Sequence, residues 1–239
     1  MDAETFFKSF AAITDAPGGV EVLRGLVLNL AIKGQLVEQN STEEPVASLL
    51  RRVGAARSGT LPTEDGQALR SAAPIEAKEG PWLIPAGWVW VRLDELALPQ
   101  AGFAFRSKQF NQTGLGTPLI RIRDIGNDAT ECHYEGDFRP EFLVEQGDYL
   151  IGMDGNFNIR RWAGPRALLN QRVTRLLFYS DELERSFVTW ALQNRINALH
   201  GTRAIRQFST YPANRSLHRT FPCRRWKSST ESLPRRISY

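Results

Sequence analysis

Residue types that could perform catalysis are few in this chain of 239 residues. None of the three histidines, His133, His200 and His218, has a second ligand at metal-binding spacing. Cys132 and Cys223 are too far apart for a CxxC site, so neither a zinc site nor a disulfide framework is indicated. The residues that most often do chemistry therefore suggest none here.

Two pairs of aspartates, Asp124 with Asp128 and Asp148 with Asp154, have the donor type that binds a metal ion. The ends of strands commonly carry such residues, however, and neither pair belongs to a known catalytic motif. The chain also has no GxSxG, Walker or dinucleotide-binding signature. We therefore predict no catalytic residue, no metal site and no bound cofactor.

Arginines and amides gather between residues 156 and 175, a stretch without an acidic residue. The members are Asn156, Asn158, Arg160, Arg161, Arg166, Asn170, Gln171, Arg172 and Arg175. Arginine pairs bidentately with guanine, and asparagine or glutamine pairs with adenine, so this mixture suits DNA recognition. We predict that Asn156, Asn158, Arg160 and Arg161 contact DNA.

Three further basic residues are candidates for the same surface. Arg106 and Lys108 belong to a polar loop that follows Gly102–Phe105, and Arg123 lies in an alternating segment further along. Basic side chains also position a protein on DNA through the phosphates. The alternative is a solvated surface whose arginines pair with nearby carboxylates, and the sequence leaves the two interpretations open.

The overall charge gives no support to DNA binding. The chain carries a net charge of +4, but the segment from Arg203 onward has nine basic residues against Glu231 alone, a net charge of +8. Residues 1–202 therefore carry −4. Any DNA contact must depend on where individual charges lie.

Helical periodicity marks the N-terminal part of the chain. Apolar residues recur at Val20, Leu23, Val27, Leu30 and Val37, close to a heptad spacing, and Gly34 is a helix stop. Near Pro45 a second helix is expected to begin, with its apolar face at Val46, Leu49, Leu50 and Val53. Such helices either pack on their own domain or form an arm that docks on another helix or subunit.

Alternating and turn-bounded segments follow. Strands are expected at Trp88–Leu93, Leu119–Ile125, Tyr149–Met153 and Leu176–Tyr179, and a helix at Ser186–Leu199. Within Leu119–Ile125 the period of two places Ile120, Ile122 and Asp124 on one face. Strands followed by a helix indicate a mixed α/β or α+β fold.

The chain therefore divides into four parts. We expect a helical segment at 1–56, a linker at 57–80, a globular domain at 81–202 and a disordered basic tail at 203–239. No run is long and apolar enough for a membrane span, and the N-terminus does not resemble a signal peptide. These features favour a cytoplasmic protein that contacts no membrane.

Six segments together resemble a known family, the specificity subunits of Type I restriction-modification enzymes, and the family shows them in the same order. The segments are Leu23–Val37, Ile84–Leu93, Gly102–Phe110, Leu119–Ile125, Gly147–Ile151 and Leu168–Val173. The resemblance covers about residues 23–202. Each piece is a weak signal alone, and their order makes the resemblance specific.

The resemblance implies a non-catalytic subunit for sequence-specific recognition of double-stranded DNA. Such subunits carry two target-recognition domains, each reading one half of a split site, joined by helical spacers that bind the methyltransferase (modification) subunits. Restriction subunits join through the complex, and S-adenosylmethionine, ATP and Mg²⁺ belong to these partners. The globular domain then reads one half-site, and the chain lacks the second domain and a complete spacer.

The basic tail suggests why the spacer is missing. With permissible codons, Pro222–Pro234 read in another frame becomes LPPLEEQHRIVA, which is similar to the segment that begins the spacer in this family. We therefore expect a frameshift near Thr202 and a truncated subunit. Two alternatives stay open: a protein-interaction module that docks on the methyltransferase subunit without binding DNA by itself, and a non-functional remnant.

Overall fold

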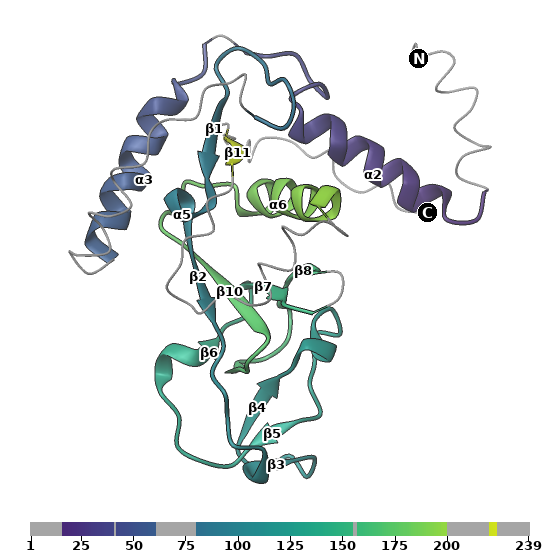
Figure 1. The fold of residues 1–239 in the computed structure, drawn as a ribbon, viewed down its shortest axis with the longest axis vertical. Coiled ribbons are helices and arrows are strands. Elements are labelled where there is room, and N and C mark those ends of the chain that lie inside the picture. Colours follow the sequence, from purple (N-terminus) through teal and green to yellow (C-terminus); the bar gives the residue numbers. More distant parts are fainter. Residues whose placement is uncertain (1–15, 41, 61–79, 155–156, 200–219, 224–239) are drawn as a thin grey trace, which may run out of the picture.

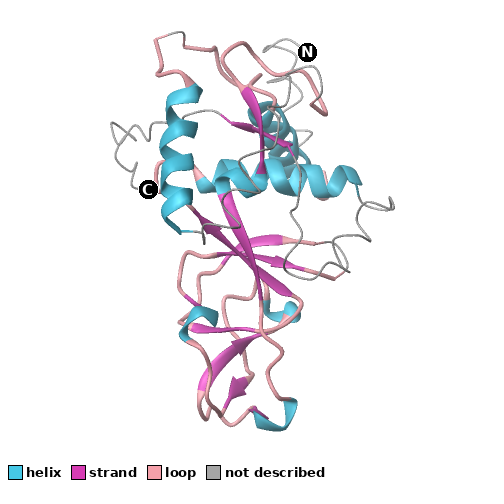
Figure 2. Cartoon of the chain, turned by 60° about the vertical axis from the view of Figure 1, so that its left-hand side comes forward, coloured by secondary structure: helices cyan, strands magenta, loops and turns pink. Residues whose placement is uncertain are grey.

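The computed structural model describes residues 16–40, 42–60, 80–154, 157–199 and 220–223. The chain forms an elongated molecule (Figure 1), with the long helices near one end and most of the strands towards the other. Figure 2 shows the same division, with helices in cyan and strands in magenta. Helices and mixed sheets in one chain confirm the predicted α+β class.

Three long helices are described: α2 (Gly19–Ile32), α3 (Val46–Thr60) and α6 (Arg185–Leu199). The predicted stop at Gly34 is confirmed, because α2 ends at Ile32 and Gly34 adopts a φ of 67°, a left-handed conformation that glycine tolerates without a steric penalty. Helix α3 runs on to Thr60, so residues 57–60 of the expected linker are helical. Residues 61–79 lie outside the described part.

The helical segment packs on the globular domain through one apolar core. Ile32 of α2, Leu49 of α3 and Leu192 of α6 all belong to it, and each is only 1% exposed. The predicted apolar face of α3 is confirmed, since Val46 and Val53 are buried in the same cluster. Helix α3 thus packs on its own domain, whereas α2 contributes only its last residue to the buried set of this core.

A small sheet pairs two distant parts of the chain. Strand β1 (Val89–Arg92) lies antiparallel to β11 (Thr220–Cys223), with Val89 opposite Cys223 and Arg92 opposite Thr220. Strand β11 falls within the segment expected to be a disordered tail, whose other residues lie outside the described part. The short helix α5 (Leu93–Leu96) follows β1 directly and leads to the larger sheets.

The central sheet is four-stranded and antiparallel, in the order β2-β10-β7-β8. Its strands are β2 (Ala97–Ala101), β10 (Val173–Phe178), β7 (Tyr149–Gly152) and β8 (Ile159–Arg161). Strand β7 matches the predicted strand Tyr149–Met153 except for its last residue. Strand β10 overlaps the predicted strand Leu176–Tyr179 and begins three residues earlier. The short strand β8 forms one edge of this sheet and carries two of the predicted DNA-contacting residues.

The second sheet has the order β3-β5-β4-β9-β6, with one parallel pair, β4 beside β9. Its strands are β3 (Phe110–Asn111), β5 (His133–Tyr134), β4 (Thr117–Ile120), β9 (Ala167–Leu169) and β6 (Leu143–Val144). The 3₁₀ turn η2 (Ser107–Gln109) leads into β3, and two more, η3 (Ile122–Asp124) and η4 (Pro140–Phe142), lie between β4 and β5 and between β5 and β6. This sheet occupies the end of the molecule opposite α2 and α3 (Figure 1).

The predicted strand over Leu119–Ile125 is wrong after Ile120, where β4 ends and the chain enters η3. The cause is local. The Asp124 carboxylate accepts a hydrogen bond of 2.8 Å from the backbone N–H of Arg121, which closes the turn. A side chain that bonds the nearby backbone in this way competes with the strand ladder, and alternation of residue types does not reveal it.

Candidate nucleic-acid interface

The edge strand β8 carries Arg160 and Arg161, both exposed, after the buried Ile159. Helix α6 fixes the start of the strand, because the Gln193 side chain accepts a hydrogen bond of 2.7 Å from the Ile159 N–H. Neither arginine forms an ion pair with any carboxylate of the described residues. Asn158, just before the strand, is also exposed. The structure therefore brings three predicted contact residues to one sheet edge.

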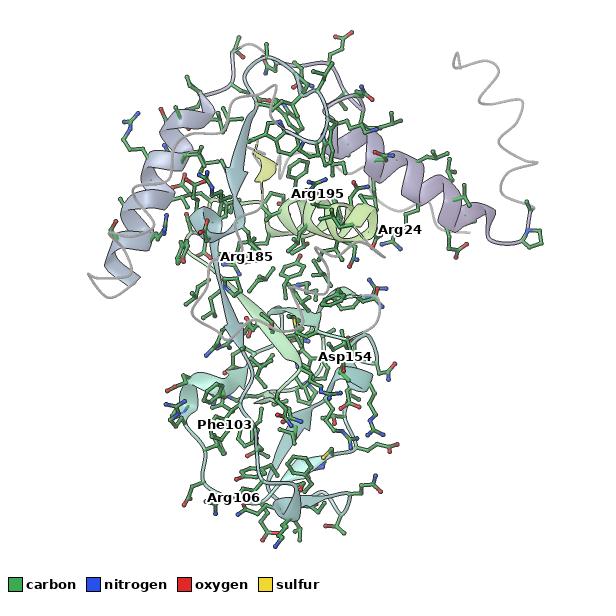
Figure 3. The ribbon with its side chains drawn as sticks, viewed as in Figure 1. Arg24, Phe103, Arg106, Asp154, Arg185 and Arg195 are labelled. Atoms are coloured by element: carbon green, nitrogen blue, oxygen red, sulfur yellow. The ribbon has the colours of Figure 1, made fainter. Side chains whose placement is uncertain are left out.

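The predicted contact Asn156 lies outside the described residues, so its position is not part of this arrangement. Its neighbour Asp154 is exposed and forms an ion pair of 2.8 Å with Arg172, which adopts a left-handed φ of 67°. Asp154 lies on the loop that connects β7 to β8, and Arg172 lies on the turn between β9 and β10. Asp154 is labelled in Figure 3, at the side of the molecule near β8.

The 3₁₀ turn η3 brings Arg123 towards the same region. Gly126, three residues further along, lies against the Arg160 side chain: a Cβ added there would be 3.8 Å from Arg160 Cγ. Arg123 is exposed, and it has no ion-pair partner within the described part of the chain. Arg123, Arg160 and Asn158 thus belong to neighbouring segments, although they are far apart in sequence.

Arg106 and Lys108 occupy a different place. Both are exposed at η2, near the far end of the molecule, where Arg106 is labelled in Figure 3. The turn is held by Gln109, whose side chain accepts a hydrogen bond of 2.9 Å from the Tyr134 hydroxyl. The predicted contact residues therefore divide into two groups, one around β8 and η3 and one at η2.

Three arginines of the basic stretch 156–175 pair with carboxylates that are distant in sequence. Arg166 contacts Glu145 at 2.7 Å, Arg172 contacts Asp154 and Arg175 contacts Asp148 at 3.1 Å. Arg175 is buried as well. The charge that the sequence shows in this stretch is therefore partly neutralised, and Arg160 and Arg161 are its two arginines without such a pair among the described residues.

Arg175 stabilises the fold and is not available for DNA contact, because its side chain is buried. Its guanidinium donates to Gln100 Oε1 at 2.6 Å, to the Glu141 carbonyl oxygen at 2.8 Å and to the Leu143 carbonyl oxygen. These bonds join β10 to β2, to η4 and to β6. A buried guanidinium needs such partners, because an unpaired buried charge is costly.

The aspartates considered as metal ligands are engaged in the fold in the same way. Asp124 is 6% exposed and accepts hydrogen bonds from Arg121 and, at 2.9 Å, from the Thr130 hydroxyl. Asp148 pairs with Arg175 and accepts a bond from the Glu145 N–H. Within the described ranges, no group of three or more His, Cys, Asp or Glu residues could hold a metal ion.

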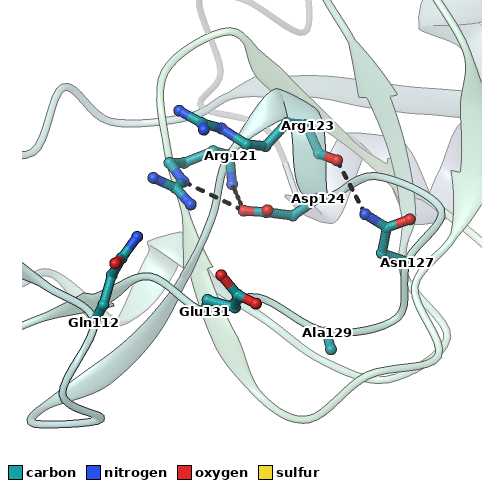
Figure 4. A pocket seen from close by; sticks show the side chains of 7 residues that line it. All are labelled: Gln112, Arg121, Arg123, Asp124, Asn127, Ala129 and Glu131. Carbon is teal, nitrogen blue, oxygen red and sulfur yellow. Dashed lines mark hydrogen bonds and ion pairs between the residues drawn. The ribbon is translucent and has the colours of Figure 1, made fainter.

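A polar cavity of about 360 Å³ lies beside η3. Figure 4 shows the side chains that line it: Gln112, Arg121, Arg123, Asp124, Asn127, Ala129 and Glu131. Arg123 was the only one of these that the sequence singled out as a contact residue. The cavity forms because η3 turns the chain back after β4, and the alternating pattern of Leu119–Ile125 hides that turn.

Over the part of the chain that the structure describes, no helix combines the length and the apolar character needed to cross a membrane.

No protein-family model matches the chain. Curated relatives do match. The chain is 37% identical over 113 residues to the Type I restriction enzyme EcoBI specificity subunit of Escherichia coli, covering 47% of this chain and 24% of the relative. It is 27% identical over 201 residues to the EcoAI specificity subunit, also from Escherichia coli, covering 78% of this chain and 34% of the relative.

A third Escherichia coli protein, the EcoEI specificity subunit, is 34% identical over 134 residues, covering 56% of this chain and 23% of the relative. The matches thus span about a quarter to a third of the length of these curated relatives. The resemblance seen in the sequence is confirmed: the chain is a relative of Type I restriction enzyme specificity subunits. All three relatives are named as specificity subunits, which is the class of protein that the sequence resembles.

Two solved structures are similar in fold. The crystal structure of the HsdS subunit from Thermoanaerobacter tengcongensis has a TM-score of 0.44 and 20% identity, covering 75% of this chain and 43% of that one. A chain from a structural study of complex assembly and conformational transition in the Type I R-M system has a TM-score of 0.48 and 18% identity, covering 87% and 47%.

Proposed function

We propose that the domain at residues 81–202 recognises one half of a split site in double-stranded DNA, and that the chain directs methyltransferase and restriction subunits to that site. The observation that carries this proposal is the exposed group of Arg160, Arg123 and Asn158, gathered at β8 and η3 without a described carboxylate partner. Its support is the sequence similarity to specificity subunits. Arginine and asparagine are side chains that contact base edges and phosphates.

The test is direct DNA binding. Duplexes selected by the wild-type chain from a randomised pool are used to compare wild type, Arg160→Ala and Arg166→Ala. Arg166 is the matched control, because its exposed guanidinium already pairs with Glu145. We expect roughly tenfold weaker binding for Arg160→Ala, within the ~1–3 kcal/mol of one arginine contact, and no change for Arg166→Ala. Failure of the wild type to enrich any sequence contradicts the proposal.

We also propose that recognition needs no cofactor in this chain, and that S-adenosylmethionine, ATP and Mg²⁺ act on the partner subunits. The isolated chain is then expected to bind DNA as tightly in EDTA, without S-adenosylmethionine or ATP, as it does with these compounds and Mg²⁺ present. A requirement for Mg²⁺ or S-adenosylmethionine by the isolated chain contradicts this part.

A second candidate function, docking on a methyltransferase subunit, is favoured by the surface of α2. Apolar side chains that are 40–61% exposed lie along this helix: Val20, Val22, Leu26, Val27 and Leu30. At 3.6 residues per turn they fall within one arc of roughly 160°, about half of the helix circumference. A broad apolar arc left exposed is typical of a helix that packs against a partner.

This second function is tested by co-purification with a methyltransferase subunit of a Type I restriction enzyme. The double variant Val22→Ser/Leu26→Ser is expected to lose the partner, and Arg24→Ser, a polar neighbour outside the apolar arc, is expected to keep it. Because all three side chains are exposed, the variants keep the fold. Equal recovery of the partner with both variants rejects α2 as the docking helix.

The proposed truncation stays a prediction. Sequencing of the gene decides it: the other reading frame downstream of the Thr202 codon should encode the LPPLEEQHRIVA-like segment. A downstream frame without that segment contradicts the frameshift.

A further inference from the structure

We propose that the cavity beside η3 receives the edge of a guanine base, and that Arg121 is the residue that reads it. The inference rests on the proposed DNA-recognition function and deepens it, because it names the base and the reading side chain. Arg121 was not among the contact residues expected from the sequence.

Arg121 is held in place before any ligand arrives. Its Nε lies 3.5 Å from Asp124 Oδ2, and the same oxygen accepts the Arg121 backbone N–H at 2.8 Å. Asp124 is itself fixed, being 6% exposed and bonded to the Thr130 hydroxyl. A side chain that is already ordered loses less conformational entropy on binding, so its contact contributes more to affinity.

The free part of the guanidinium faces the cavity. Figure 4 shows the Nε side of Arg121 directed at Asp124, while the rest of the group lies among the lining side chains. Within the described residues, no hydrogen-bond partner occupies its two terminal nitrogens. These nitrogens form the planar fork that matches O6 and N7 of guanine, the commonest base-specific contact of arginine in the major groove.

Arg123, two residues further along, has a different environment and therefore a different role. It is exposed and has no described carboxylate beside it, whereas the Arg121 side chain is only 20% exposed. An unrestrained, solvated arginine suits a phosphate, which needs charge but little geometric precision. The turn η3 thus offers one arginine for base reading and one for positioning on the backbone.

The other polar walls of the cavity favour a base edge over a bare phosphate. Gln112, Asn127 and Glu131 present amide and carboxylate groups. Asn127 is oriented by a hydrogen bond of 3.2 Å from its Nδ2 to the Arg123 carbonyl oxygen. The carboxylate of Glu131 repels a phosphate but accepts a hydrogen bond from the amino group of cytosine, the partner of guanine.

The experiment compares base preferences of the wild type, Arg121→Lys, Arg121→Ala and the control Arg166→Ala. Each full-length protein selects duplexes from a randomised pool, and affinities are then measured over a range of salt. We expect Arg121→Ala to lose the preference for guanine at one position and to bind the wild-type site about 5- to 150-fold more weakly, while preferences at other positions persist. Arg121→Lys, which lacks the planar fork, is expected to keep a weaker preference for guanine. Lysine keeps the charge, so its salt dependence is expected to match the wild type.

A second measurement tests whether Arg121 contacts the N7 atom of that guanine. Replacing that guanine by 7-deazaguanine, which lacks the N7 acceptor, is expected to weaken wild-type binding and to have no further effect on Arg121→Ala. Three results overturn the inference while leaving the proposed function intact: an unchanged guanine preference in Arg121→Ala, a changed preference at an adenine instead, or an unchanged penalty for 7-deazaguanine in Arg121→Ala. Absence of any sequence preference in the wild type overturns both. Thermal unfolding of each variant confirms that the fold is retained.

Discussion

Arg160 and Arg161 are consecutive in β8, yet their side chains lie on opposite faces of the edge strand. Arg160 lies opposite Leu150, which is buried in the core between the sheets, and its side chain lies against Gly126. Arg161 lies opposite Tyr149, and its guanidinium lies near Gly147. Because successive side chains of a strand alternate between its faces, only Arg160 shares a face with η3 and Arg123.

We therefore predict unequal effects of the two single variants on DNA binding. Arg160→Ala should weaken binding to a selected duplex roughly tenfold, consistent with the ~1–3 kcal/mol of one arginine contact. Arg161→Ala should change it less than about threefold, an effect of under ~0.7 kcal/mol. Fluorescence anisotropy titrations at one salt concentration measure both, and an equal loss in the two variants contradicts the assignment of Arg160 alone to the η3 face.

Arg175 is predicted to matter for stability instead. Its side chain is 10% exposed and is bonded to Asp148 and to main-chain oxygens. Its removal leaves Asp148 without its charge partner, so Arg175→Ala should lower the free energy of unfolding by about 3–5 kcal/mol. Arg166→Ala, which breaks an exposed pair, should lower it by less than ~1 kcal/mol. Urea denaturation of the two variants measures both values; equal losses are inconsistent with a structural role for Arg175.

Much of the fold could be predicted because its signals are local. Helix α6, the apolar face of α3 and strand β7 follow from spacing within a window of 5 to 15 residues, and the stop at Gly34 follows from one glycine. One strand was predicted too long. The residues of Leu119–Ile125 alternate as in a strand, but the Asp124 carboxylate accepts a hydrogen bond from the Arg121 backbone N–H, and the chain turns at η3.

The candidate site was harder to predict from the sequence, because residues far away in the sequence determine which arginines form ion pairs and which stay unpaired. Glu145 and Asp148 precede Arg166 and Arg175 by more than 20 residues in the sequence, so their pairing depends on sheet order. Amphipathic spacing likewise could not tell that α3 buries its apolar face whereas α2 leaves its own exposed. The reading role proposed for Arg121 had no sequence signal, since it depends on the buried Asp124.

For the second basic group, Arg106 and Lys108, we predict a contribution that does not depend on the DNA sequence. Both are exposed on η2, and neither has a described carboxylate partner, so they suit phosphates. The variant Arg106→Ala/Lys108→Ala should weaken binding to all duplexes alike and reduce the salt-dependence slope by about 2, close to one per contact. Titrations of a selected and an unrelated duplex between 50 and 200 mM salt, a range in which phosphate contacts lose affinity steeply, test this. A loss confined to the selected duplex points to base reading instead.

Strand β11 is predicted to stabilise the helical end of the molecule. It pairs with β1 along four residue positions, and β1 has no other strand beside it in the described part. A chain ended after Arg219 should therefore be less stable than one ended after Cys223, by at least about 1 kcal/mol or roughly 2–4 °C in melting temperature. Comparing these two lengths by circular dichroism isolates the strand from the residues that follow it. Identical melting curves contradict a stabilising role for β11.

Alkaline pH is predicted to destabilise the fold through Cys132. This thiol is 2% exposed, and burial raises its pKa above the ordinary value of 9.0, an effect that the nearby Arg121 opposes only in part. Burial raises the pKa values of Tyr149 and Tyr179 above 10.0 in the same way. The folded chain then keeps protons that the unfolded chain has released, so stability is complete below pH 9 and falls as the pH rises above it.

Cys132→Ala isolates the contribution of the thiol to this pH dependence. Each group can contribute at most about 1.4 kcal/mol per pH unit, in the window between its unfolded and folded pKa values. The variant is less stable overall, because a buried side chain becomes smaller, but its unfolding free energy should fall less steeply between pH 8.5 and 10 than that of the wild type. Urea denaturation at intervals across this range gives both slopes. Parallel slopes mean that Cys132 does not hold its proton more tightly in the folded chain, and they contradict the prediction, because the two tyrosines lose protons only above about pH 10.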